Sequence, residues 1–533
     1  MHTRSLILAP VLACLLAIPG ATRADAQQRP NRPGPPGGRA ADDRPADKDA
    51  GVEPVENVST TQHTTTINGK TVAYTANAGT MVLRDEDGKP NASVFYISYT
   101  ADNQQTAARP VTFFFNGGPG SASIWLDMGI MSPKVPHMGP GGSQPAPPYD
   151  LADNPNSPLD VTDLVQVDAM MTGYSRPGVG VKPSEFTGAT NDIKMFAQFI
   201  RRYLDKYDRW ASPKYLFGES YGTFRSAGLA SELQEAGIEL NGIMLLGTVL
   251  DFQYLSASPT NDIGYAAFLP TYTATAWYHK KLPAALQAQT LEQVVQQSRA
   301  YAFGDYLTAL ARGNTLTPAE RGAVAQKLSQ LTGVSPQFIE STNLRIDAGH
   351  YRTELLRDQR LMLGRYDTRL TALNGNPANQ RQDFDPSSVA PSSAFMTAFM
   401  RYLHNDLKYT NDLEYYTGGH TGRWDYSDLG RGYPSEVESL RLAMAKNPYL
   451  RVMVGAGYYD TATPFANAEY TFTHLGFDQT YRDRVSFKYY ESGHMAYLNQ
   501  DSAKQLKADI AGFITSTEHL GRSLTNAPTS AGR

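Results

Sequence analysis

The chain has 533 residues, of which 41% are hydrophobic and 19% are charged. It can therefore bury a large core, and a wholly disordered protein is excluded. The 48 Lys and Arg against 52 Asp and Glu leave a net charge of −4, and no block of like charge stands out. We therefore expect neither nucleic acid nor an anionic membrane as a partner.

The N-terminus has the pattern of an export signal. A basic start is followed by an apolar run over residues 5–20 and by the small-residue cleavage site Ala24-Asp25-Ala26. We predict a signal peptide over residues 1–26 and a mature protein that is periplasmic or secreted. Cys14 is the only cysteine, so lipid attachment there is a minor alternative, and a cleaved chain contains no disulfide to stabilise it.

Composition divides the rest of the chain into four parts. Residues 27–55 are rich in Pro, Gly, Asp and Arg with little apolar content, which predicts a disordered linker. The regular strand pattern is absent between about residues 251 and 446 and then returns, which indicates a segment inserted into the sheet domain. The predicted parts are the linker, a core over 56–250 and 447–517, a mainly helical inserted cap over 251–446, and a flexible tail over 518–533.

The core pattern is typical of an α/β protein. Two β-like segments, residues 64–85 and 93–100, flank turn-forming residues 87–90 and predict an antiparallel edge. Afterwards apolar runs alternate with amphipathic stretches, as in a mostly parallel sheet covered by helices. The predicted strands are 111–115, 164–170, 215–217, 243–246, 450–454 and 485–489, and the predicted helices are 191–207, 224–234 and 502–514.

The strongest chemical signal is Gly218-Glu219-Ser220-Tyr221-Gly222. This G-x-S-x-G sequence follows a predicted strand and precedes a predicted helix, which is the context of a nucleophile elbow. The glycines leave room for a strained turn that lifts the serine hydroxyl above the sheet. We therefore predict Ser220 as a catalytic nucleophile.

A serine hydroxyl needs an imidazole to take its proton and an acid to orient that imidazole. His494 follows the last predicted strand and is the predicted base. Asp460 follows the strand-like apolar run that begins near residue 450 and is the predicted acid. Asp251 also follows a strand-like run and is the alternative acid. The order Ser220, Asp460, His494 is the order found in hydrolases with such an elbow.

An oxyanion needs backbone donors that are already in place. The glycine-rich sequence Asn116-Gly117-Gly118-Pro119-Gly120 follows the strand predicted at 111–115. We predict the N–H groups of Gly118 and Tyr221 as the oxyanion hole.

These motifs together resemble the serine carboxypeptidase family in its carboxypeptidase Y-like form. The resemblance lies in the Asn116–Gly120 loop, the Ser220 elbow, the Asp460 segment and Gly493-His494-Met495, and residues 167–175 add to it. It implies an α/β-hydrolase fold and removal of C-terminal residues from peptides through an acyl-enzyme on Ser220. The absence of the disulfides common in eukaryotic members fits a bacterial-type member.

The resemblance also implies that Asn116, Gly117 and Glu219 bind the terminal carboxylate of the substrate. A carboxyl group that faces a carboxylate must hold a proton, so activity is expected to favour acidic pH. The position of the family's second such acid falls on Ile130. An esterase, an amidase or an acyltransferase that uses the same triad therefore stays open as an alternative.

No metal-binding or nucleotide-binding motif is present in the sequence, so we expect no cofactor. The expected partners are peptide or protein C-termini as substrates, without an integral membrane segment after removal of the signal.

Overall fold

The computed structural model describes residues 51–102, 108–430, 432–476, 478–518 and 520. The predicted signal peptide and most of the predicted linker lie outside these residues. The last residues of that linker are described and contact the core. Val52 N–H donates to Pro177 O at 3.0 Å, and Thr80 Oγ1 donates to Val55 O at 2.8 Å. Within the described ranges no helix has the length and apolar character needed to cross a membrane.

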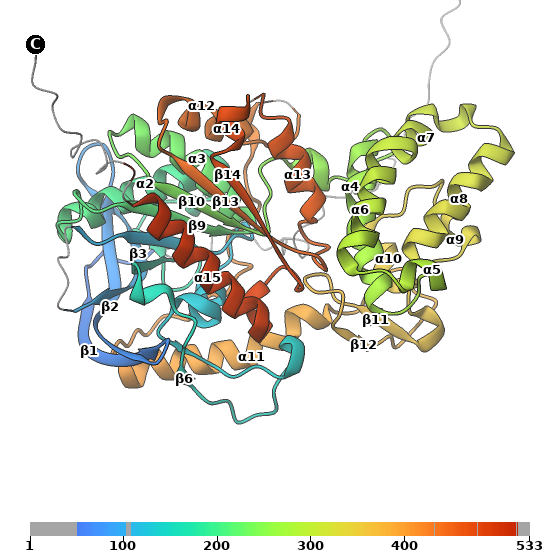
Figure 1. Cartoon of the computed structure of the whole chain (residues 1–533). Coiled ribbons are helices and arrows are strands. Elements are labelled where there is room, and N and C mark those ends of the chain that lie inside the picture. Colours follow the sequence, from blue (N-terminus) through green and yellow to red (C-terminus); the bar gives the residue numbers. More distant parts are fainter. Residues whose placement is uncertain (1–50, 103–107, 431, 477, 519, 521–533) are drawn as a thin grey trace, which may run out of the picture. The chain divides into compact units, whose positions relative to one another are not determined.

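The main sheet has the strand order β1-β2-β3-β7-β4-β9-β10-β13-β14, with β8 paired to β3 (Figure 1). Strands β1 to β3 and β7 pair antiparallel, and every pair from β7 to β14 is parallel. This confirms the predicted mostly parallel sheet with an antiparallel edge. The strands are β1 (Val58–Ile67), β2 (Lys70–Arg84), β3 (Pro90–Ala101), β4 (Val111–Phe115), β7 (Asp163–Val167), β8 (Arg176–Pro177), β9 (Lys214–Glu219), β10 (Gly242–Leu246), β13 (Arg451–Gly457) and β14 (Val485–Tyr490).

The antiparallel edge differs from the prediction in one respect. Residues 64–85 were predicted as one strand, which is wrong, because the chain reverses at Asn68-Gly69 to form the β1–β2 hairpin. Both turn residues have positive φ, at 50° and 73°. Asn-Gly is the dipeptide that most readily adopts this tight hairpin turn, so the signal was present in the sequence.

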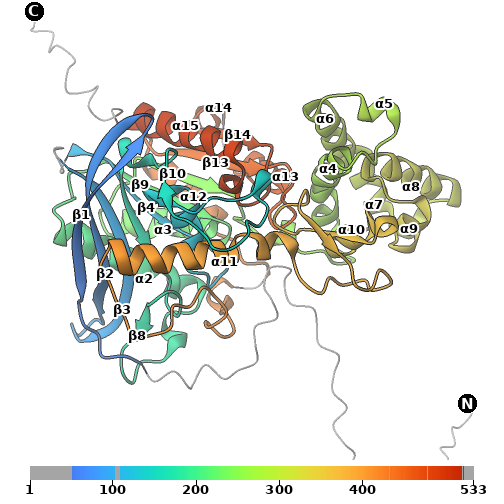
Figure 2. The ribbon, with the colours of Figure 1, turned by 90° about the horizontal axis from the view of Figure 1, so that it is seen from below.

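The parallel strands bury side chains on both faces. Phe113 and Phe115 of β4 point into one hydrophobic cluster and Phe114 points into the other. The first cluster includes residues of α2 (Ala189–Lys206), α3 (Tyr221–Glu235) and α12 (Val437–Lys446), and the second includes residues of α15 (Gln500–Thr517) and α11 (Pro386–Arg401). Figures 1 and 2 show these helices on the two faces. The strands therefore carry continuous apolar runs rather than alternation.

The span predicted as the cap packs in two ways. Helices α4 to α10 share a hydrophobic cluster of their own with Leu363 of β11, whereas α11 and the segment after it belong to a cluster of the main sheet. The elements of the first group are α4 (Asp262–Tyr278), α5 (Ala284–Gln287), α6 (Leu291–Tyr301), α7 (Leu307–Arg312), α8 (Pro318–Thr332), α9 (Pro336–Ser341), α10 (Ala348–Glu354), β11 (Leu361–Leu363) and β12 (Thr371–Leu373). The remaining short elements are α1 (Ile124–Leu126), β5 (Lys134–Val135), β6 (Ala152–Asp153), α13 (Phe465–Thr473) and α14 (Gln479–Arg482).

Candidate active site

Ser220 lies between β9 and α3, in the sharp turn that the sequence predicts. Its φ of 59° and ψ of −127° are unusual for a residue with a side chain, and its N–H donates to Leu246 O at 2.9 Å. A Cβ atom on Gly218 would lie 2.1 Å from Gly222 O, and one on Gly222 would lie 2.7 Å from Phe115 O. Only glycine fits at these two positions, so the elbow depends on both.

The structure brings His494 and Asp460 into contact. The Nδ1 atom of His494 lies 2.7 Å from Oδ2 of Asp460, and the two side chains are 2% and 0% exposed. Burial lowers the pKa of His494, but the charge and the hydrogen bond of Asp460 together with the charge of Glu219 outweigh burial, so the net pKa lies above the ordinary value. Nδ1–H donates to the carboxylate, which leaves Nε2 of His494 as the proton acceptor.

The carboxylate of Asp460 is itself held in place by its own loop. Its Oδ1 accepts the N–H groups of Ala462 at 2.7 Å and Thr463 at 3.0 Å, and its Oδ2 accepts the Thr463 hydroxyl at 2.8 Å. Thr463 Oγ1 also lies 3.0 Å from His494 Nδ1. The sequence analysis did not identify Thr463, although its position three residues after Asp460 is a usable signal.

The backbone after β10 links Ser220 to His494. Ser220 bonds to Leu246, and a Cβ atom on the next residue, Gly247, would lie 2.7 Å from the ring of His494. The rival acid Asp251 lies elsewhere, where it accepts the Gln253 N–H at 2.7 Å as the cap of a short helix. Of the two candidate acids, the structure therefore brings Asp460 to His494.

The glycine-rich loop after β4 lies against the elbow. A Cβ atom on Gly117 would lie 2.3 Å from the N atom of Tyr221, and Gly118 has a φ of 106°. Tyr221 is the first residue of α3, so its N–H has no acceptor within the helix. The predicted donors Gly118 and Tyr221 thus belong to two backbone segments in close contact beside Ser220.

Glu219 and Asn116 form a buried pair next to the nucleophile. Asn116 Nδ2 donates to Glu219 Oε1 at 2.9 Å, and each residue is 2% exposed. Burial raises the pKa of Glu219 to about 7, against a lowering by the charge of His494 and by the Tyr497 and Asn116 side chains. Glu219 is therefore a neutral acid at moderately acidic pH.

A segment far away in the sequence covers His494. The Tyr366 ring stacks on the His494 ring with centroids 5.2 Å apart, and Tyr366 O accepts the His494 N–H at 2.6 Å. Asp367 Oδ2 accepts the Gly493 N–H at 3.1 Å, and Arg369 donates to the same carboxylate at 2.6 Å. Nothing in the sequence around Tyr366 indicates this role.

Arg225 on α3 forms a hydrogen bond to the glycine-rich loop. Its guanidinium donates to Asp192 Oδ2 at 2.6 Å and to Asn116 O at 2.7 Å, and the two side chains of the ion pair are 0% and 1% exposed. The ion pair thus ties α2 and α3 to the residue that holds Glu219.

Replacing Arg225 by Met is expected to lower the free energy of unfolding by about 3–5 kcal/mol, because the Asp192 carboxylate then stays buried without a partner. Denaturant unfolding of the purified protein measures this change. The double variant D192N/R225M, which has no unpaired charge, should lose less than R225M alone. A double variant that loses more than R225M would contradict this account.

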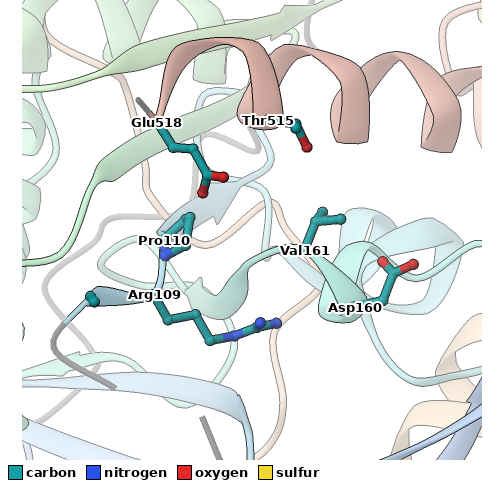
Figure 3. A pocket seen from close by; sticks show the side chains of 7 residues that line it. Arg109, Pro110, Asp160, Val161, Thr515 and Glu518 are labelled. Carbon is teal, nitrogen blue, oxygen red and sulfur yellow. The ribbon is translucent and has the colours of Figure 1, made fainter. Parts of the chain in front are cut away.

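A separate pocket lies at the opposite edge of the sheet. Its volume is about 460 Å³, and Figure 3 shows its lining side chains. Pro110 and Val161 lie just before β4 and β7, so the pocket is at the amino ends of the strands, whereas Ser220 is at a carboxyl end. Two of its charged side chains form ion pairs, Arg109 with Asp163 at 2.7 Å and Asp160 with Lys507. This pocket therefore contributes nothing to the chemistry at Ser220.

Comparisons with known proteins identify the family to which the chain belongs. The model of the family described as serine carboxypeptidase matches residues 71–521. A carboxypeptidase Y homolog of Arthroderma benhamiae is 27% identical over 162 residues, a match that covers 29% of this chain and spans only 30% of that relative.

Two of the solved structures that the comparison finds match this chain at low identity. The proline iminopeptidase of Mycobacterium smegmatis is 15% identical, with a TM-score of 0.34 over 83% of this chain and 99% of that one. A carboxyl esterase of Bacillus coagulans is 12% identical, with a TM-score of 0.31 over 82% of this chain and 98% of that one. With the parallel sheet and its helices, the family match establishes an α/β-hydrolase fold. The chain belongs to the serine carboxypeptidase family.

Proposed function

We propose that this protein is a serine-type carboxypeptidase that releases C-terminal residues from peptides. The observation that supports this most is Glu219, a buried acid with a raised pKa directly before the nucleophile. No Lys or Arg side chain pairs with it among the residues that the structure describes. A neutral acid in this position suits a carboxylate ligand, which it can bind by donating a hydrogen bond.

In the proposed first half-reaction, Ser220 Oγ attacks the carbonyl carbon of the last peptide bond while Nε2 of His494 takes the hydroxyl proton. The Gly118 and Tyr221 N–H groups donate to the oxyanion. The tetrahedral intermediate collapses as the C–N bond breaks, and His494 returns the proton to the leaving amine. Asp460 stabilises the imidazolium throughout.

In the second half-reaction, water attacks the acyl-enzyme and gives a proton to His494. A second tetrahedral intermediate forms and is held by the same two N–H groups. It collapses when the bond to Ser220 Oγ breaks, and His494 returns the proton to the serine. The shortened peptide then leaves with a new terminal carboxylate.

The reaction is tested with an N-blocked dipeptide, its C-terminally amidated twin and an ester twin, with Ser220→Ala as the blank. We expect release of the last residue from the free acid, with Glu219 as the group that selects for the carboxylate. Amino-acid release measured between about pH 4 and 9 follows the reaction. Turnover of only the amide or the ester would overturn the proposal.

The pH profile follows from two groups that interact, Glu219 and His494. Glu219 must hold its proton, so kcat/KM for the free acid should fall up to about tenfold per pH unit above pH 7. His494 must be neutral to act as the base, so kcat/KM should fall again at low pH, below its raised pKa. The two limbs belong to the coupled pair, and activity is expected to peak between them, where Glu219 is protonated and His494 is neutral.

The Glu219→Gln variant isolates the alkaline limb. Its amide keeps a donor and an acceptor but does not titrate, so we expect the fall of free-acid kcat/KM above pH 7 to disappear while the acid limb remains. Initial rates across the pH range measure this, with the ester twin as the control substrate. An unchanged alkaline limb in E219Q would show that another group sets it.

A second candidate is an esterase, amidase or acyltransferase that uses the same triad. It is favoured by Ile130, a fully buried apolar side chain at the position of the family's second carboxylate-binding acid. The three-substrate comparison separates the two candidates.

We also propose that the protein is exported to the periplasm or secreted, as a bacterial-type member of the family. The signal-like residues 1–26 support this. Expression of the full gene with N-terminal sequencing of the exported product should find a start near Gln27. A product that retains its first residues, or one that carries lipid on Cys14, would contradict cleavage at this site.

A further inference from the structure

Tyr497 lies three residues after His494, in the short helical turn Ala496–Leu498. Its side chain is only 5% exposed. Its ring packs so tightly against the helical turn Asp127–Met131 that a Cβ atom on Gly129 would lie 2.3 Å from the ring. Tyr497 thus packs against the helical turn that also contains Ile130.

Two polar atoms in this region have no hydrogen bond. Oε2 of Glu219 and the hydroxyl oxygen of Tyr497 are both buried, and neither makes a hydrogen bond of ordinary geometry within the described part of the chain, although the two side chains lie close enough to shift one another's pKa. Unsatisfied buried polar atoms are costly, so each one calls for an explanation. Here both lie on side chains that interact with one another and with Asn116.

The other polar atoms of the pair are already occupied. Asn116 Nδ2 donates to Glu219 Oε1 at 2.9 Å, and Asn116 Oδ1 accepts the Leu126 N–H at 2.9 Å. Asn116 is therefore fixed on both sides and holds Glu219 in one orientation. The vacant positions are those of Glu219 Oε2 and the Tyr497 hydroxyl.

The Tyr497 hydroxyl is a donor across the working pH range. Its pKa is raised well above the ordinary value, by burial first and then by the charge of Glu219. It stays neutral wherever Glu219 and His494 titrate. A protonated Glu219 and a neutral Tyr497 together present two donors, which match the two oxygens of one carboxylate.

We propose that Tyr497 is the second donor of the substrate carboxylate site: its hydroxyl donates to one oxygen of the terminal carboxylate while protonated Glu219 donates to the other. This inference rests on the proposed carboxypeptidase function. It assigns to a phenol the part that a second acid plays elsewhere in the family, at a position where this chain has Ile130. Carboxylate binding then depends on the protonation of one acid, Glu219. The groups that influence the pKa of Glu219 are the charged His494 and Asp460 and the neutral Asn116 and Tyr497.

The test is Tyr497→Phe, which keeps the ring against Gly129 and removes only the hydroxyl. We expect kcat/KM for the N-blocked dipeptide to fall about tenfold or more, mainly through a higher KM, since a hydrogen bond to a charged group is lost. Hydrolysis of p-nitrophenyl acetate, which has no carboxylate to bind, should change less than about twofold. Labelling of Ser220 by a fluorophosphonate should proceed at the wild-type rate.

The matched control is Tyr490→Phe. Tyr490 is fully buried, and its hydroxyl donates to Asp509 Oδ2 at 3.1 Å, on helix α15. The ratio of free-acid to acetate-ester activity should stay at the wild-type value in Y490F. A fall of that ratio in Y490F as large as in Y497F would overturn the inference, since loss of any buried phenol would then suffice.

Three outcomes separate a failure of the Tyr497 inference from a failure of the proposed carboxypeptidase function. An unchanged KM for the free acid in Y497F overturns the inference while the carboxypeptidase function stands. Equal loss of dipeptide, ester and fluorophosphonate reactivity overturns it as well, because Tyr497 then only supports the fold. Failure of the wild-type enzyme to release residues from the free acid, with ester turnover intact, overturns the proposed function itself.

Discussion

Replacing Ser220 by Ala is expected to lower kcat by about 10⁶-fold, to the level that binding and oxyanion stabilisation give without a nucleophile. The serine hydroxyl is the only group in the proposed mechanism that forms a bond to the substrate. The Ala side chain keeps a Cβ atom, so the strained turn at φ 59° keeps the same steric environment. Amino-acid release from the N-blocked dipeptide by purified variant measures the loss.

The matched control is Ser231→Ala. Ser231 is a partly exposed residue of the same helix, α3, and its loss should leave kcat within about twofold of the wild type. Fluorophosphonate labelling should be absent in S220A and normal in S231A. More than a few per cent of residual activity in S220A, free of wild-type contamination, would mean that another nucleophile is used.

Replacing Asp460 by Asn is expected to lower kcat by about 10⁴-fold with little change in structure. Asn keeps the Oδ1 acceptor for the Ala462 and Thr463 N–H groups. It presents an amide N–H to Nδ1 of His494 where the carboxylate accepted a hydrogen bond, so the imidazole is held in the tautomer that is protonated on Nε2. That nitrogen can then no longer take the proton of Ser220.

The rival acid supplies the control for this prediction. Asp251 caps a short helix and accepts the Gln253 N–H, so Asp251→Asn should retain most of the wild-type kcat. Steady-state kinetics of D460N and D251N, with thermal unfolding of both, separates catalysis from stability. Loss of activity in D251N together with retention in D460N would reverse the assignment of the acid.

Local sequence patterns were enough to identify the elements on which the site is built. The apolar run before Gly218 and the stretch after Gly222 became β9 and α3, because a continuous apolar run in a parallel sheet is buried on both faces. Asp460 and His494 were placed because the carboxyl ends of parallel strands meet at one edge of the sheet. The Asn68-Gly69 turn was missed although its signal is also local.

Only the tertiary structure decided which side chains surround these residues. Tyr366 stacks on His494, and Tyr497 faces Glu219, yet no periodicity or motif links the members of either pair. Their proximity depends on how the β11–β12 segment and the turn after β14 pack, which is set by shape complementarity summed over many side chains. Hydrophobic patterns specify which face of an element is buried, and the close packing of the whole fold specifies which neighbour it meets.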